Sequence, residues 1–280
     1  ALTRTAQLAP PARKAGSFGL AVTPPAICFA RVMARGHEVI AAIAPHDSAE
    51  RYTRLGVEVF EGHARLVDPW TIDIAMSDGS TRRLTSRAII IASGAGPSVP
   101  PLPGLEEVDF LTSDNMWDRL KDRKRAPARL VVLGGGPIGS EFAQSFARLG
   151  SQVTQIEMAP RILVRGDEEV SDLICKSLED DGVVVLTGHK ALSCGVSDGQ
   201  KWIEVEKDGG TRRIAFDALI VAVGRSPRLS GFGLEDLGIP IGKVVDTNEY
   251  LETISPNILA AGDVAGPYQL THVAAHQAWY

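Results

Sequence analysis

The residues best suited to carry out chemistry lie in mid-chain, in the run GGGPIG at positions 134–139. An apolar stretch precedes this run, and a stretch with helical spacing and a second apolar stretch follow it. In such a strand, turn, helix and strand, Gly134 allows a tight turn, Gly136 lets the backbone approach a pyrophosphate, and Gly139 lets helix and strand pack closely. The free N–H groups and the positive dipole end of the helix favour the phosphates. The spacing therefore predicts a dinucleotide-binding turn, whose cofactor-binding residues are Gly134, Gly136, Pro137, Ile138 and Gly139.

Glu157 ends the second apolar stretch, near the usual distance of about 20 residues from the glycines. A carboxylate there can accept hydrogen bonds from the 2′-hydroxyl of the adenosine ribose, whereas a 2′-phosphate would meet like charge and usually needs an arginine. NAD is therefore favoured over NADP. Arg161 is close enough in sequence to work against this preference, and a solvated glutamate at a strand end is the alternative interpretation.

The composition is that of an ordinary globular protein with 280 residues, 44% of them hydrophobic, which is enough for one large or two ordinary domains. The net charge of -5 offers no basic surface for nucleic acid or for an anionic membrane. No apolar run approaches the roughly 18 residues that span a bilayer, and the opening residues lack the order of a signal peptide. We therefore expect a cytoplasmic protein that binds neither nucleic acid nor membrane.

Three cysteines, Cys28, Cys175 and Cys194, lie far apart and show no metal or redox spacing, which is typical of reduced thiols. His272 and His276 are four positions apart on an expected helix, but no third ligand accompanies them. We therefore expect no metal site.

Residues 1–50 are expected to form helices, because apolar positions in VMARGHEVIAAI recur at helical spacing. Pro10-Pro11 and Pro24-Pro25 are expected to interrupt them, since proline lacks the N–H of the helical hydrogen bond. These helices are expected to connect other elements.

Short strands are expected from VEVFEG to AIIIASGA, between residues 57 and 95, with Asp78-Gly79 as a hairpin turn. A proline-rich crossing and a polar helix candidate at 114–124 then lead to the glycine-rich turn. This change of pattern places a domain boundary near Leu111.

In the second half of the chain we expect a helix at 168–181 and then a hairpin over 201–216 that turns at Asp208-Gly209-Gly210. A buried strand follows at 218–224. A later apolar strand, ILAAGDVAG, enters a Gly-Asp turn and is followed by a helix candidate at 271–280.

Four segments, in this order and spacing, resemble the FAD-dependent pyridine nucleotide-disulfide oxidoreductases. They are AIIIASGAGPSVPPLPGL, the glycine-rich turn, VAVGRSPR and ILAAGDVAGPYQLTHVA, and they resemble dihydrolipoamide dehydrogenase and mercuric reductase-like members most. The resemblance implies an α/β fold in which a Rossmann-like NAD domain, residues 112–245, is inserted into an incomplete Rossmann-like FAD domain, residues 1–111 and 246–280. The inserted position explains why the glycine-rich turn appears so late in the chain.

The resemblance also implies a flavin site. Ser93 and Gly94 match a segment near the junction of the two domains, with serine in place of the more usual threonine. Gly262 and Asp263 match the family's flavin motif, in which the carboxylate accepts a hydrogen bond from a ribityl hydroxyl and the following helix points its N-terminus toward the flavin. An ordinary turn is the alternative interpretation of Gly262-Asp263.

Three further positions are implied in the same way. Glu141 matches a family glutamate on the nicotinamide side of NAD, although a solvated glutamate in the first helical turn would explain it as well. Gly224 resembles the family's glycine beside bound NAD, and Ala64 resembles a backbone contact to the flavin adenine.

The implied activity is a hydride transfer from NADH to FAD and on to a disulfide or metal-ion acceptor, in a protein that is a homodimer when complete. The sequence departs from the family because it has no amino-terminal G-x-G-x-x-G, no C-x-x-x-x-C pair and no carboxy-terminal interface domain, so it looks truncated at both ends. Two alternatives stay open: a non-catalytic NAD-binding fragment, and a flavin reductase or NADH oxidase relative without redox cysteines.

Overall fold

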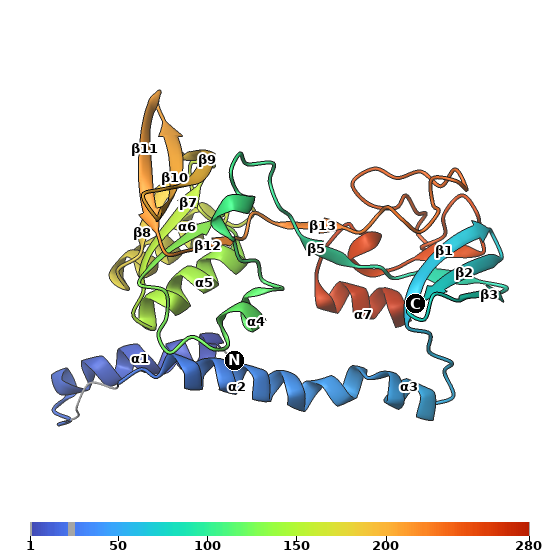
Figure 1. Cartoon of the computed structure of the whole chain (residues 1–280), viewed down its shortest axis with the longest axis horizontal. Helices are drawn as coiled ribbons and strands as arrows, with labels where there is room; N and C mark the ends of the chain where they lie inside the picture. The colour runs from blue at the N-terminus through green and yellow to red at the C-terminus, as the bar shows by residue number, and fades with distance from the viewer. Residues whose placement is uncertain (1, 22–25, 280) are drawn as a thin grey trace. The chain divides into compact units, whose positions relative to one another are not determined.

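The computed structural model describes residues 2–21 and 26–279, and the chain forms two compact units (Figure 1). Unit 1 contains residues 1–44 and 97–224, and unit 2 contains residues 45–96 and 225–280. Each unit is therefore assembled from two separate stretches of the chain.

Unit 1 is built on a four-stranded parallel sheet with the strand order β12-β6-β7-β8. Its strands are β6 (Arg129–Leu133), β7 (Gln152–Glu157), β8 (Val184–Thr187) and β12 (Ala218–Val221). Because parallel strands are covered on both faces, β6 and β12 are nearly continuous apolar runs, as the sequence predicts.

Two helices connect the strands of this sheet: α5 (Pro137–Arg148) joins β6 to β7, and α6 (Glu168–Asp180) joins β7 to β8. Asp181, the residue after α6, connects the two helices through hydrogen bonds to α5. Its Oδ2 accepts hydrogen bonds from Gln144 Nε2 at 2.9 Å and from Arg148 Nε at 2.9 Å. The helix that begins at the glycine-rich turn is thus held to its neighbour.

A three-stranded antiparallel sheet lies in the chain between β8 and β12, with the order β11-β10-β9. Its strands are β9 (Lys190–Ser197), β10 (Gln200–Lys207) and β11 (Gly210–Phe216). The second hairpin turns at Asp208-Gly209, whose φ angles of 53° and 80° suit a two-residue turn. One core cluster joins both sheets: Leu105, Val108, Val131, Leu133, Ile156, Cys194, Ile203, Val205, Phe216, Leu219 and Val221.

The first helices also belong to unit 1. They are α1 (Leu2–Lys14) and α2 (Phe29–Ile43). The expected interruption at Pro10-Pro11 is wrong, because α1 continues through both prolines. Its buried residues Leu2, Ala6 and Ala9 pack in the core, which compensates for the lost helical hydrogen bonds. Pro24-Pro25 lies outside the described residues.

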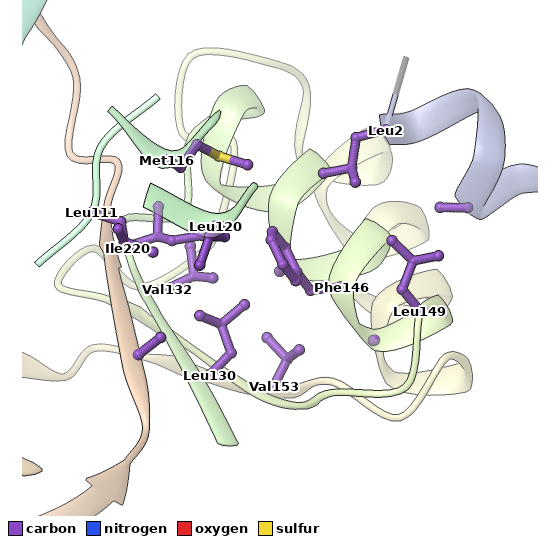
Figure 2. Packing of buried hydrophobic residues seen from close by; sticks show 14 of the residues in the cluster. Leu2, Leu111, Met116, Leu120, Leu130, Val132, Phe146, Leu149, Val153 and Ile220 are labelled. Carbon is purple, nitrogen blue, oxygen red and sulfur yellow. The ribbon is translucent and has the colours of Figure 1, made fainter. Parts of the chain in front are cut away.

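Figure 2 shows the main core of unit 1, which buries side chains from the first helices, the parallel sheet and α5. The labelled members are Leu2, Leu111, Met116, Leu120, Leu130, Val132, Phe146, Leu149, Val153 and Ile220. Phe29 of α2 packs on Phe146 of α5 with ring centroids 6.0 Å apart. Since each large apolar side chain contributes about 1.5–3 kcal/mol on burial, this cluster is a main source of stability.

Unit 2 contains an antiparallel sheet of β1 (Gly62–Asp68), β2 (Thr71–Met76) and β3 (Thr81–Thr85). The predicted Asp78-Gly79 turn lies between β2 and β3, with Gly79 at φ 84°. The strand expected at VEVFEG is wrong: residues 57–61 form no strand, because they pair with no neighbouring strand and are largely exposed.

Two short pairs complete the strands. The first is parallel and joins β4 (Ile89–Ile91) to β14 (Ile258–Ala260), and the second joins β5 (Ala95–Pro97) to β13 (Arg225–Pro227). The remaining helices are α3 (Ala49–Arg54), α4 (Met116–Leu120), α7 (Thr271–Trp279), η1 (Ala15–Phe18), η2 (Ala44–Asp47), η3 (Glu106–Val108) and η4 (Gly262–Val264). The polar helix expected over 114–124 is therefore shorter than expected.

The compact units end elsewhere than the expected domain boundaries near 111 and 246. Residues 97–111 lie with unit 1, where Leu111 forms a parallel bridge to Ile220. Residues 225–245 lie with unit 2, where Val245 N donates to Val264 O at 2.9 Å. The assignment of FAD and NAD to particular residue ranges stays a prediction.

Candidate functional site

The glycine-rich turn connects β6 to α5, and three of its glycines are needed by the protein's own packing. A Cβ atom at Gly135 would lie 2.9 Å from Glu157 Cβ. A Cβ atom at Gly134, whose φ is 117°, would lie 2.3 Å from Ala222 O. A Cβ atom at Gly139 would lie 2.3 Å from Gly134 O. All three distances are below van der Waals contact, so any side chain there would force neighbouring atoms apart.

Gly136 is different, because a Cβ atom there would meet nothing within 4 Å. Its φ of −73° is also one that any residue adopts. Neither packing nor backbone strain explains this glycine. The open space before it suits the close approach of a phosphate, as the sequence predicts.

The start of α5 offers hydrogen-bond donors beside that open space. Pro137 at the first helical position has no N–H to lose, and the N–H groups of Ile138 and Gly139 have no acceptor within the helix. The first helical bond is from Ser140 N to Gly136 O at 2.9 Å. The residues present therefore fit a dinucleotide pyrophosphate.

Glu157 lies at the end of β7, with its carboxylate against the turn. Its Oε2 accepts a hydrogen bond from Gly135 N at 2.6 Å, and its Oε1 accepts one from Ala159 N at 2.7 Å. Each carboxylate oxygen keeps a further lone pair. Glu157 can thus accept hydrogen bonds from a ribose while its own position is held by the backbone.

Arg161 and the loop after β7 were not assigned a structural role from the sequence. The guanidinium donates to the carbonyl oxygens of Leu163 at 3.3 Å, Val164 at 3.2 Å and Gly166 at 3.0 Å. Leu163 N in turn donates to Gly135 O at 2.8 Å. Three N–H groups of Arg161 are therefore engaged by its own loop, which contacts the glycine-rich turn through Leu163.

Gln155 is a second residue that sequence reasoning missed. It lies in β7, and its Nε2 donates to Gly134 O at 3.0 Å and to Ser140 Oγ at 3.2 Å. The available signal was an amide directly before the apolar Ile156, in the middle of a strand whose parallel sheet is covered on both faces.

Glu141 and Gly224 lie in the same unit as the turn. Glu141 is exposed on α5. Gly224 has a φ of 136°, and its carbonyl oxygen accepts a hydrogen bond from Ser98 N at 2.9 Å, so its backbone conformation already requires glycine. Their roles toward NAD stay predictions.

Unit 2 has a cavity of about 580 Å³, which is within the usual range for ligand sites. It brings Gly94 together with Gly262 and Asp263, although they are far apart in sequence. The full lining is Ala92, Gly94, Arg225, Ala261, Gly262, Asp263, Gln269, Thr271, Ala274 and Ala278. An acidic side chain, small residues and the first turn of α7 meet here, and they fit the polar chain of a flavin cofactor.

Gln277 of α7 supports this cavity and was also missed. Its Oε1 accepts a hydrogen bond from Gly262 N at 2.7 Å, and its Nε2 donates to Gly266 O at 2.9 Å. One amide therefore holds both ends of the loop that carries Asp263.

Two other predicted flavin residues are placed differently. Ser93 donates its hydroxyl to Arg228 O at 2.9 Å, and Ala64 lies on the exposed part of β1. Neither is in the lining of the cavity. Their contacts to a flavin stay predictions.

Metal-binding side chains do not gather among residues 2–21 and 26–279, where no group of three or more His, Cys, Asp or Glu could hold an ion. His272 and His276 are both exposed on α7. In the same described part of the chain, no helix is both long and apolar enough to cross a bilayer.

The three cysteines are free thiols, and Cys28 lies directly before α2. Burial raises the pKa of Cys194, in β9, to about 11. Burial and the neighbouring carboxylate of Glu179 raise the pKa of Cys175, in α6. Since the thiolate is the reactive form, neither thiol is activated for disulfide exchange.

The sequence over residues 23–278 matches the pyridine nucleotide-disulphide oxidoreductase family. The chain belongs to this family, whose members are NAD(P)H-dependent flavoprotein oxidoreductases that use FAD. The family expected from the sequence and the α/β fold are thereby confirmed.

Among similar proteins, a mercuric reductase from Staphylococcus aureus is 36% identical over 233 residues, which are 82% of this chain and 40% of that protein. A dihydrolipoyl dehydrogenase from Thermus scotoductus is 38% identical over 225 residues, which are 78% of this chain and 46% of that protein. The solved structure of the HOCl-induced flavoprotein disulfide reductase RclA from Escherichia coli superposes with a TM-score of 0.79 at 26% identity, covering 99% of this chain and 57% of that one. The chain thus spans about half the length of the curated relatives it matches.

Proposed function

We propose that unit 1 binds NADH at the glycine-rich turn and that unit 2 contributes to a flavin site, in a protein that passes a hydride from NADH to FAD and on to a disulfide or metal-ion acceptor. The observation that carries the proposal is Gly136, a glycine that the chain's own packing and backbone angles do not require. A ligand that approaches the backbone supplies the missing reason.

The residues of unit 1 would bind and orient the cofactor. The N–H groups of Gly136, Ile138 and Gly139 would hold its pyrophosphate, and the carboxylate of Glu157 would accept hydrogen bonds from the adenosine ribose. NADH is preferred over NADPH, because a 2′-phosphate would face Glu157 while three N–H groups of Arg161 are engaged by backbone carbonyls.

In unit 2, Asp263 would accept a hydrogen bond from the ribityl chain, and the N-terminal end of α7 would favour negative charge on the reduced ring. NADH would supply the hydride and FAD would relay it as electrons to the acceptor. Gln277 keeps the loop of Asp263 in place through its two hydrogen bonds.

The acceptor thiols are a further part of the proposal. Cys28, Cys175 and Cys194 lie far apart in the sequence and without redox spacing, which supports the view that the family's cysteine pair is not among these 280 residues. A homodimer of the complete protein and a cytoplasmic location belong to the same proposal.

Isothermal calorimetry with NADH tests the central claim through Gly136→Ala. The new methyl group meets no protein atom within 4 Å, so we expect unchanged thermal stability but NADH affinity at least about tenfold lower, or about 1.4 kcal/mol. Gly16→Ala is the matched control in the same unit, because its Cβ also meets nothing. Tight NADH binding that survives Gly136→Ala would refute this site.

A further inference from the structure

Gln155 is fully buried, with 0% of its surface exposed, in a strand that runs between two others. Its partners in the sheet register are two apolar residues, Val132 on β6 and Val185 on β8. Burying an amide costs free energy unless all its polar atoms are hydrogen-bonded. The residue therefore needs an explanation other than core packing.

The hydrogen bonds of Gln155 reach both ends of the glycine-rich turn. Its Nε2 donates to Gly134 O at 3.0 Å, where the glycine-rich turn begins, and to Ser140 Oγ at 3.2 Å, in the first helical turn of α5. Because a backbone carbonyl only accepts, this contact assigns nitrogen rather than oxygen to that side of the amide.

The other amide atom, Oε1, is buried and has no hydrogen-bond partner among the described residues. An unpaired buried acceptor lowers stability relative to an apolar side chain of the same shape. Gln155 therefore weakens the core while it holds the turn.

Gln155 and Glu157 together fix one peptide group. They are two positions apart on β7 and so project to the same side of the sheet. Gln155 donates to the carbonyl oxygen of the Gly134–Gly135 peptide at 3.0 Å, and Glu157 accepts from the N–H of that same peptide at 2.6 Å. A planar peptide held at both polar ends cannot rotate.

We propose that Gln155 is a positioning residue for the dinucleotide: it fixes the Gly134–Gly135 peptide so that the following N–H groups already face the pyrophosphate before it binds. This inference rests on the proposed binding of NADH. Pre-organisation of this kind raises affinity by removing the cost of ordering the loop during binding.

Gln155→Met tests the inference, because methionine has a similar length and no polar amide. We expect thermal stability equal to or above that of the unchanged protein, an NADH dissociation constant about tenfold higher by calorimetry, and faster hydrogen exchange of the Gly135 amide without cofactor. A purely structural residue would instead lose stability and leave the other two measurements unchanged.

Ser151→Ala is the matched control, since Ser151 is 7% exposed just before β7 and its hydroxyl also has no partner among the described residues. It should alter stability alone. If Gln155→Met does not fold, Ser140→Ala removes one of the two acceptors, and we expect it to speed exchange at Gly135 to a smaller degree.

The outcomes separate the two claims. If the wild-type protein does not bind NADH, the proposed function is wrong. Hydrogen exchange of the Gly135 amide would still show whether Gln155 fixes the peptide. If the wild-type protein binds NADH and the Gln155→Met variant has the same NADH affinity and the same hydrogen exchange at Gly135, only this inference is wrong.

Discussion

Glu157 accepts a hydrogen bond from the backbone N–H of Gly135 at 2.6 Å, so the residue that would bind the ribose also holds the turn that would bind the phosphates. The second oxygen of the same carboxylate accepts from Ala159 N at 2.7 Å. Both backbone donors therefore depend on a side chain with two acceptor oxygens.

Glu157→Gln should weaken NADH binding about tenfold or more, because a glutamine must turn its NH₂ group toward one of the two backbone N–H donors. Glu157→Arg should shift the preference toward NADPH. Calorimetry with both cofactors measures each effect, and Glu169→Gln on the exposed side of α6 is the charge-matched control. Equal NADH affinity in the Glu157→Gln protein would contradict the assignment.

Arg161 should affect NADH binding through its hydrogen bonds to the loop after β7 rather than through its charge. Arg161→Met frees the carbonyls of Leu163, Val164 and Gly166, so the loop that donates to Gly135 O should loosen. We expect a lower melting temperature and NADH affinity reduced about fivefold.

Arg165→Met removes the same charge from an exposed position of the same loop and should change neither quantity. If both variants weaken NADH binding equally, electrostatic attraction explains the effect and the loop contacts do not.

The ion pair of Arg129 and Asp217 should make unit 1 sensitive to acid. Arg129 Nη2 lies 2.6 Å from Asp217 Oδ1, and this hydrogen bond lowers the pKa of the carboxyl group from its ordinary value of 3.8. A carboxyl whose pKa is lower in the folded state stabilises the fold above its unfolded pKa, and that stability is lost as pH falls through the folded pKa.

Urea unfolding at pH values from neutral to below 3.8 should therefore show a decline in the free energy of unfolding that Asp217→Asn reduces. Because the pair is partly exposed, the variant should lose only about 1 kcal/mol at neutral pH. Asp122→Asn, an exposed control, should keep the decline. An identical pH profile for Asp217→Asn would show that this pair does not contribute.

The cysteines should react with a thiol reagent in order of exposure. Cys28 is exposed and should be modified first, followed by the half-buried Cys175. With a pKa of about 11, Cys194 should stay unmodified until the protein unfolds, since at pH 8 only about 0.1% of such a thiol is thiolate. Mass spectrometry after timed alkylation gives the order; early modification of Cys194 would contradict its burial.

Elements defined by local pattern could be predicted from the sequence. The glycine-rich turn, β6 and β7 follow from glycine spacing and apolar runs, and the Asp208-Gly209 hairpin follows from turn chemistry. The path of α1 through Pro10-Pro11 could not be predicted, because the packing that permits it comes from residues more than a hundred positions away.

The sequence predicts the candidate site only where spacing within a motif marks a residue. Gly136 follows from the spacing of the glycines, and Glu157 follows from its distance along the sequence from them. Gln155, Arg161 and Gln277 act through hydrogen bonds to main-chain atoms of loops, and such bonds depend on where the folded backbone brings those atoms. Nothing in the spacing of these side chains indicates their acceptors.

The strand order β12-β6-β7-β8 has a consequence for how the protein is made. β6 ends at Leu133, but its partner β12 begins only at Ala218. One edge of β6 therefore has no partner while the ribosome synthesises β7 to β11. Contacts between such distant segments slow folding, and an open apolar edge invites pairing between nascent chains. Translation that pauses before β12 has left the ribosome should therefore leave unit 1 dependent on chaperones, whereas a pause after β12 has emerged should not.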